Sequence, residues 1–125
     1  MIRITLLVTC AVFGLASSVV PAVPDCSSLR SSLRTAQSWL SDHTSNLRNA
    51  QRDLSDAQRR HREAQDEYRR AKTESERGYA QTRIRSAESA IQSAESRVRY
   101  SQDKVDYYNR EISNVQDRMD REGCR

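Results

Sequence analysis

The chain contains very few residues that interrupt helices. Of its 125 residues, three are glycine and two are proline, and both prolines precede residue 25. From there to Glu122 the only glycine is Gly78. Because glycine and proline are the residues that most often end or break a helix, their scarcity favours long helices over a chain with many turns.

Apolar and aromatic residues are also scarce. Only 36% of the residues are apolar, 30% are charged, and there is a single Trp and a single Phe. This is little apolar mass for a globular core, and it suits either long solvated helices or disorder. At this length the chain forms at most one small domain. The periodicity of the apolar residues decides between helix and disorder.

Signatures of catalysis are missing as well. The chain has no glycine-rich phosphate loop, no GxSxG or HExxH motif and no catalytic Cys/His arrangement. Its two histidines, His43 and His61, are eighteen residues apart, so no set of metal ligands converges on them. We therefore expect neither an enzyme nor a cofactor site, and no pocket for a small-molecule substrate.

Residues 1–22 have the layout of a secretory signal peptide. A basic residue, Arg3, precedes an apolar stretch and then a run of small residues. A signal anchor is the alternative, but polar residues dilute the stretch, and Pro21 and Pro24 interrupt its end. We expect a secreted, extracellular domain over residues 23–125, with no membrane span once the signal is removed. The cleavage points compatible with the pattern follow Ala16, Ser18 or Ala22.

The cysteines fit an oxidising compartment. Cys10 lies in the signal peptide, which leaves Cys26 and Cys124 near the two ends of the mature chain. An even number of cysteines in a secreted chain predicts a disulfide. The sequence leaves open whether this bond joins Cys26 to Cys124 within one chain, or joins like residues of two parallel chains.

Two rows of residues recur with a seven-residue period in the first half of the chain. Residues between the rows are polar, which is the pattern of a heptad helix. The row of large residues is Leu33, Leu40, Leu47, Leu54, His61 and Tyr68. The row of mostly small residues is Ala36, His43, Ala50, Ala57, Ala64 and Ala71.

The second half repeats the pattern out of phase with the first. Its rows start two residues away from where the first rows would continue, and neither a three-residue nor a four-residue insertion gives this offset. This offset favours a turn over one continuous coiled coil, and a parallel dimer of long bent helices is the alternative. The large row is Ile84, Ile91, Val98, Val105, Ile112 and Met119. The second row is Ala87, Ala94, Ser101, Tyr108, Val115 and Glu122.

We therefore predict an all-α fold, a two-helix antiparallel coiled-coil hairpin. Arg77 and Gly78 lie in a turn near residues 75–79, with helix one at about 27–74 and helix two at about 80–121. Such a turn brings the two terminal cysteines to the same open end, where a disulfide closes the hairpin. Centring the turn between Arg77 and Gly78 places large residues opposite small ones, and centring it half a heptad earlier gives a similar match, so the register stays open.

The positive charge of the chain is concentrated in one segment. Residues 59–85 contain nine basic and five acidic residues, whereas the rest is close to neutral. The hairpin would gather these charges at its turn end, where they could bind an anionic surface. An ordinary solvated helix face, with pairs such as Glu63–Arg59 and Asp66–Arg70, is the alternative. The candidate anion-binding residues are Arg69, Arg70, Lys72, Arg77, Arg83 and Arg85.

Several aromatic residues lie outside the heptad rows. Tyr100 and Tyr107 are one heptad apart and project from the same side of helix two, and Trp39 lies outside the rows of helix one. These three residues either flank the helix contact or form a contact strip for a partner.

Two kinds of function fit these features. The leading hypothesis is a secreted, non-catalytic structural or protein-interaction module that presents an elongated charged surface to a protein partner or to itself. The alternative is a secreted effector, such as a defence, venom, salivary or reproductive protein, whose basic turn end binds a glycosaminoglycan, a cell surface or an acidic host protein. Secretion argues against intracellular nucleic-acid binding, and the narrow apolar rows argue against lipid association.

Overall fold

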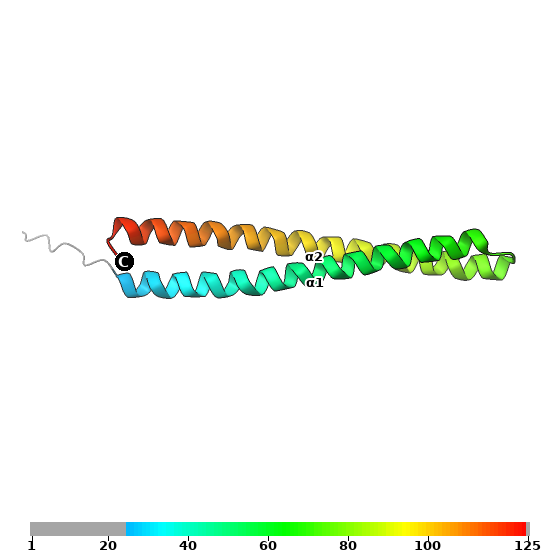
Figure 1. The fold of residues 1–125 in the computed structure, drawn as a ribbon, viewed down its shortest axis with the longest axis horizontal. Coiled ribbons are helices and arrows are strands. Elements are labelled where there is room, and N and C mark those ends of the chain that lie inside the picture. The colour runs from blue at the N-terminus through cyan, green and yellow to red at the C-terminus, as the bar shows by residue number, and fades with distance from the viewer. Residues whose placement is uncertain (1–24, 125) are drawn as a thin grey trace, which may run out of the picture.

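The computed structural model describes residues 25–124, which form two long helices. Helix α1 spans Cys26–Arg70 and helix α2 spans Glu74–Arg121. The helices run antiparallel and contact each other extensively, so the described chain is a single helical hairpin (Figure 1). This confirms the predicted all-α hairpin. The predicted signal peptide, residues 1–22, lies outside the described residues.

The connection between the helices comes earlier than the sequence analysis predicted. Residues 71–73 join α1 to α2. The predicted turn at residues 75–79 lies inside α2, so the assignment of Arg77 and Gly78 to the turn is wrong. The first helix ends at Arg70 instead of residue 74, and the second begins at Glu74 instead of residue 80.

A capping box explains why α2 begins where it does. Thr73 Oγ1 accepts a hydrogen bond from the Glu76 backbone N–H at 3.2 Å. In return, Glu76 Oε2 accepts bonds from the backbone N–H groups of Lys72 at 2.8 Å and Thr73 at 3.1 Å. These bonds satisfy N–H groups that have no partner within the helix. Those two backbone bonds, led by the one from Lys72, hold the pKa of the Glu76 carboxyl below its usual value.

Gly78 occupies the second turn of α2, where a side chain would stabilise the helix. Its φ is not positive, and a Cβ atom added there would meet nothing within 4 Å. Since glycine loses more backbone entropy than alanine in a helix, we expect Gly78→Ala to raise the free energy of unfolding by about 0.5–1 kcal/mol. Urea unfolding followed by circular dichroism measures this change.

Gly123→Ala is the matched control for that substitution. Gly123 has a φ of +69°, a conformation that alanine adopts only with strain. We therefore expect Gly123→Ala to destabilise the hairpin while Gly78→Ala stabilises it. A loss of stability in Gly78→Ala would restore the turn to residues 75–79.

The end of α2 directs Cys124 towards the start of α1. The Gly123 N–H donates to the Asp120 carbonyl oxygen at 3.2 Å, and the Cys124 N–H donates to the Met119 carbonyl oxygen at 2.8 Å. This is the Schellman arrangement, which reverses the chain direction after a helix through a glycine with positive φ. Cys124 is 3% exposed as a result.

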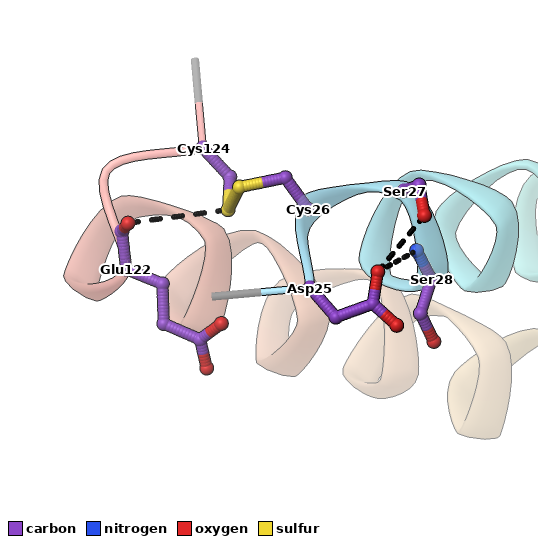
Figure 2. The surroundings of a disulfide bond; sticks show 6 residues. All are labelled: Asp25, Cys26, Ser27, Ser28, Glu122 and Cys124. Atoms are coloured by element: carbon purple, nitrogen blue, oxygen red, sulfur yellow. Dashed lines mark hydrogen bonds between the residues drawn. A yellow bond between two sulfur atoms is a disulfide. The ribbon is translucent and has the colours of Figure 1, made fainter. Parts of the chain in front are cut away.

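The disulfide between Cys26 and Cys124 joins the two helix ends. The Cα atoms of the two cysteines are 5.3 Å apart and the residues are 98 positions apart in sequence (Figure 2). Next to the bond, Asp25 caps α1 by accepting hydrogen bonds from the Ser28 N–H at 3.1 Å and the Ser27 hydroxyl at 2.8 Å. These bonds, the Ser28 bond first, lower the pKa of Asp25. The predicted disulfide within one chain is confirmed.

The contact between the helices is centred on the small residues. Each helix also has a heptad row of large residues, and these residues, such as Leu54 on α1 and Ile91 on α2, are only half-buried. Alanine side chains allow two helices to approach closely, and the large aliphatic side chains at the neighbouring heptad positions then lie beside the contact line. Near the disulfide, Leu29 occupies the same row as Ala36 and is itself buried. We call the row of small residues in each helix the seam. Its buried members are Ala36, Ala50, Ala57, Ala64, Ala80, Ala87, Ala94 and Ser101.

Three cross-links between the helices fix the register. The Cys26–Cys124 disulfide and the ion pairs Asp53–Arg97 and Glu67–Arg83 each lie symmetrically about residue 75 in the sequence. The hairpin is therefore centred at residue 75, between the two centres that the sequence analysis weighed, and neither of those registers is the observed one. The predicted pairing of large with small residues is also wrong, because the small residues of both helices are the buried ones.

The rows on either side of the seam lie on opposite faces of the hairpin. Each residue turns a helix by about 100°, so the residue three positions after a seam residue lies to one side and the residue four positions after lies to the other. Asp53 and Arg97 both follow a seam alanine by three positions, and their side chains meet at 2.9 Å. The two helices therefore share one face for the residues at plus three and the other for those at plus four.

These two faces differ in chemistry. The residues three positions after a seam residue, together with the residues beside them that lie farther from the seam, form what we call the polar–aromatic face. The residues at plus four are aliphatic over most of the length and half-buried, and we call their side the apolar face. The polar–aromatic face includes Trp39, Asn46, Asp53, Ser93, Arg97, Tyr100, Lys104 and Tyr107. The apolar face includes Leu40, Leu47, Leu54, Ile84, Ile91, Val98, Val105 and Ile112.

Candidate interaction surface

Five rings gather where the polar–aromatic face meets the seam, in the half of the hairpin nearer the disulfide. His43 lies between its neighbours: its ring centroid is 5.5 Å from that of Tyr108 and 6.1 Å from that of Trp39, and both pairs are stacked. Tyr108 also stacks on Trp39 at 6.4 Å. Tyr100 and Tyr107 meet this stack edge-on, at 6.3 Å from His43 and 5.1 Å from Tyr108. We call these five residues the aromatic cluster.

The cluster has a half-buried base and an exposed rim. His43 and Tyr108 occupy seam positions and are half-buried between the helices. Trp39, Tyr100 and Tyr107 are 48%, 59% and 49% exposed. Because the exposed rings contact rings held in the seam, they are supported in one arrangement before any partner arrives. Such preorganisation reduces the entropy that binding must overcome.

A single cation lies over the rim of the cluster. The Lys104 Nζ atom is 5.6 Å from the Tyr100 ring centroid and 5.9 Å from the Tyr107 ring centroid. A cation over an aromatic face is attracted by about 0.5–1 kcal/mol at exposed sites. Lys104 therefore holds two tyrosines of successive heptads as one unit.

Grooves rich in hydroxyl and amide groups flank the cluster on the same face. Three cluster residues, Trp39, Tyr107 and Tyr108, line one groove, and Tyr100 lines the other. The first groove is lined by Ser31, Ser32, Thr35, Ala36, Trp39, Tyr107, Tyr108 and Glu111. The second groove is lined by Asn46, Asn49, Ala50, Ser93, Ser96, Arg97, Tyr100 and Ser101.

The structure brings together the three aromatic residues that the sequence singled out. Trp39, Tyr100 and Tyr107 lie in one cluster, and their contact with a partner stays a prediction. The sequence analysis missed the part played by His43 and Tyr108. Both interrupt a row of small residues, and two large rings at corresponding seam positions were the signal that could have placed them opposite each other.

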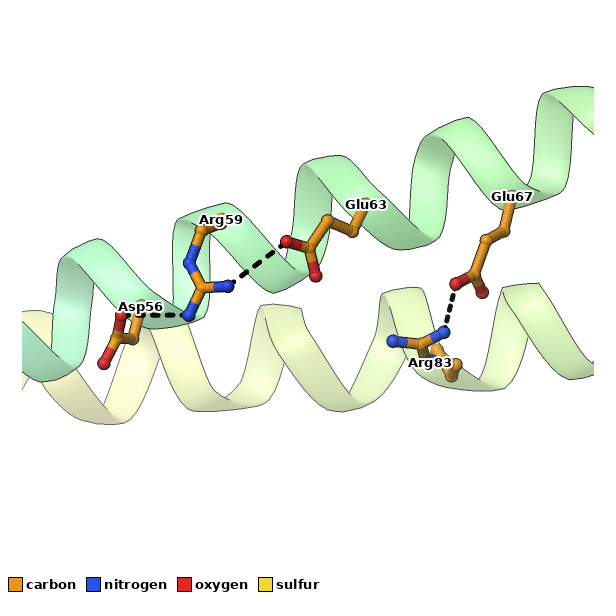
Figure 3. Close-up of polar contacts among 5 residues, drawn as sticks. All are labelled: Asp56, Arg59, Glu63, Glu67 and Arg83. Carbon is orange, nitrogen blue, oxygen red and sulfur yellow. Dashed lines mark hydrogen bonds and ion pairs between the residues drawn. The ribbon is translucent and has the colours of Figure 1, made fainter.

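The basic residues do gather towards the turn end, but acidic residues accompany them. Arg69 pairs with Asp66. Arg83 reaches from α2 to Glu67 on α1 (Figure 3). The hydrogen bond that Arg83 donates to the Glu67 carboxylate raises the pKa of the Arg83 guanidinium above its usual value. The remaining four candidate residues, Arg70, Lys72, Arg77 and Arg85, are exposed.

Farther from the turn, a similar arrangement neutralises another arginine. Arg59 bridges Asp56 and Glu63, with both contacts at 3.3 Å (Figure 3). The predicted pair Glu63–Arg59 is present. Asp66, however, pairs with Arg69 where the sequence analysis expected Arg70. Much of the basic segment is thus a solvated helix face with local ion pairs, which are worth little individually.

The histidines do not belong to a metal site in the described part of the chain. No group of three or more His, Cys, Asp or Glu side chains within residues 25–124 is arranged to hold a metal ion. His43 Nδ1 is buried without a hydrogen-bond partner. His61 Nε2 lies 3.5 Å from Glu88 Oε1 but forms no hydrogen bond with it. Neither helix in this part of the chain has an apolar stretch long enough to cross a bilayer.

No protein-family model, curated protein sequence or solved structure matches the chain. The candidate surface therefore rests on the chemistry and geometry of its own residues.

Proposed function

We propose that the protein is a secreted, non-catalytic interaction module that binds a protein partner through its polar–aromatic face. The observation that carries the proposal is the aromatic cluster. The chain has few aromatic residues, yet three of them, Trp39, Tyr100 and Tyr107, expose about half of their surface side by side. Large amphipathic rings of this kind supply most of the binding energy in protein interfaces.

The residues around the cluster support the same function. Protein-binding surfaces such as antibody paratopes combine rigid Tyr and Trp anchors with Ser and Asn side chains that supply adaptable hydrogen bonds. The two grooves beside the cluster are lined by this combination of residues, with Arg97 and Glu111 at their edges. The surface therefore has a centre of anchors and a polar surround, as hot spots in interfaces do.

Secretion is the second part of the proposal. It rests on the signal-peptide pattern at residues 1–22 and on the disulfide, since such bonds persist in oxidising compartments. A hairpin closed in this way withstands dilution outside the cell without help from a partner. The rigid rod then serves as a scaffold on which the aromatic cluster is displayed.

The test is an affinity comparison with a matched control. The hairpin is immobilised and exposed to the fluid into which its source cells secrete, and each captured protein is purified and its dissociation constant for the hairpin measured. We expect Trp39→Ala combined with Tyr107→Ala to raise that constant at least about 30-fold, the size of a hot-spot effect. Tyr79→Ala, which removes a 69% exposed aromatic side chain outside the cluster, leaves it unchanged.

Two results would contradict the proposal. One is equal loss of binding in Tyr79→Ala and in the double variant, because the aromatic cluster would then have no special role. The other is retention on heparin that falls steeply with salt and is abolished by changing Arg70, Arg77 and Arg85 to Gln, while the double variant binds normally. That outcome would assign the function to the basic turn end.

A further inference from the structure

We propose that the apolar face binds a second copy of this chain, so that two hairpins form a four-helix bundle with their polar–aromatic faces outward. This face is opposite the aromatic cluster, and the inference does not depend on the proposed function. Its starting point is the unusual position of the seam. Because the small residues lie at the centre of the helix contact, the large aliphatic residues are left half-exposed along one side.

The aliphatic stripe is continuous and long. It contains two parallel rows, one from each helix, that run from Leu33 to Leu54 on α1 and from Ile84 to Ile112 on α2. In an ordinary two-stranded coiled coil, the knobs of both rows are covered by the partner helix. Here the small row of each helix is covered, whereas the large row is half-buried and its outer side is not covered by residues 25–124.

The residues beside the stripe have the composition of an interface. The positions next to it on α1 are Gln37, Thr44, Gln51, Gln58 and Gln65. Those on α2 are Gln81, Glu88, Glu95, Gln102, Asn109 and Gln116. The row on α1 starts with Arg30, beside Leu33, and ends with Lys72 at the turn, and no residue of the row between these two is basic although the chain carries 21 lysines and arginines. Interface cores are depleted of charge in this way, whereas helices that bind anionic lipid place Lys and Arg beside their apolar face.

The size of the face matches what a stable dimer needs. A helix of 45 residues is about 65 Å long at 1.5 Å per residue. Two helices of about 10 Å diameter with their flanking rows then offer roughly 1,000 Å², which exceeds the approximately 800 Å² that each partner contributes to a standard interface. A straight face of this length is best covered by a partner of the same length and spacing, and a second hairpin has both.

The charge distribution favours an antiparallel pair. Residues 59–85, at the turn end, contain nine basic and five acidic residues. The other described residues, 25–58 and 86–124, contain ten basic and twelve acidic residues. An antiparallel two-fold pair places the basic turn end of each copy beside the slightly acidic half of the other. It also places Leu47, near the middle of α1, close to the two-fold axis.

The test is the mass of the disulfide-closed chain of residues 23–125 in solution. We expect sedimentation equilibrium to give the mass of two chains at about 10 µM, where a dimer with a dissociation constant near 1 µM is mostly assembled. Leu47→Glu places a carboxylate on the apolar face of both copies and raises that constant at least about 30-fold. Asn46→Glu, one residue away on the polar–aromatic face, leaves the mass at two chains.

A second variant separates loss of pairing from loss of folding. Leu47→Ala introduces the residue with the highest helix propensity and removes the large side chain, so that α1 itself is not weakened. We expect it to retain the helical circular-dichroism signal and raise the dissociation constant about tenfold. A wild-type mass of one chain at 10 µM would overturn the inference. So would a dimer that persists in both Leu47 variants, a dimer lost equally in Asn46→Glu, or single chains that float with phosphatidylserine vesicles.

Discussion

Removing the disulfide is expected to lower the free energy of unfolding by about 4–5 kcal/mol, the entropy of closing a loop of this length in the unfolded chain. The bond joins residues 98 positions apart, so it restricts nearly the whole described chain. The hairpin has few other sources of stability, since its buried residues are mostly alanines, which bury little apolar area. A loss of this size is a large share of the 5–15 kcal/mol that small domains possess.

Thermal unfolding of Cys26→Ser combined with Cys124→Ser, followed at 222 nm, measures this effect. At one fixed chain concentration, we expect the midpoint to fall by about 20 °C or more, since each kcal/mol shifts it by about 4–8 °C in a domain of this size. Reductant should lower the wild-type midpoint by the same amount and leave the serine variant unchanged. A fall of less than about 5 °C would mean that the helix contacts alone hold the hairpin together.

Ala94→Leu is expected to lower the free energy of unfolding by about 1–3 kcal/mol, the usual effect of overfilling a packed core. Ala94 is 1% exposed, at the centre of the seam. A leucine there has no space between the helices and must push them apart. Because the two helices are long and stiff, pushing them apart at Ala94 also loosens the packing of the neighbouring seam residues, Ala87 and Ser101.

Ala90→Leu is the matched control for this substitution. Ala90 is an exposed alanine of the same helix that lines an open groove beside the seam, so an added side chain has room there and we expect a change within about 0.5 kcal/mol. Urea unfolding of both variants provides the comparison. If Ala94→Leu proved neutral or stabilising, the helix contact would be centred between the small and large rows, as in a conventional coiled coil.

The sequence was sufficient to predict two helices and their closure, because a seven-residue period sustained over six repeats has few other solutions. It did not place the turn, because Gly78 favours residues 75–79 whereas the residues that start α2 are Thr73 and Glu76. A glycine inside a helix costs only about 1 kcal/mol, whereas a Thr-x-x-Glu capping box satisfies several backbone groups at once. The local hydrogen bonds of residues 72–76 were therefore the stronger signal.

The two faces could not be predicted from the period alone. A heptad pattern treats its two rows as equal, and only the close approach of the helices decides that alanines such as Ala57 lie at the centre while Leu54 lies to one side. Likewise, the sequence marked Trp39 and Tyr107 as lying off the rows. The stacking of His43 on Tyr108 depends on the register between helices, which the sequence had left between two values.

The most direct test of the hairpin is to ask whether the disulfide joins residues of one chain. Equal amounts of ordinary and ¹⁵N-labelled chains are mixed unfolded and reduced, oxidised together as they refold, and digested without reduction. The account predicts that every peptide containing Cys26 bonded to Cys124 is wholly light or wholly heavy in the mass spectrum. Peptides that combine a light half with a heavy half, or that join Cys26 to Cys26, would contradict it.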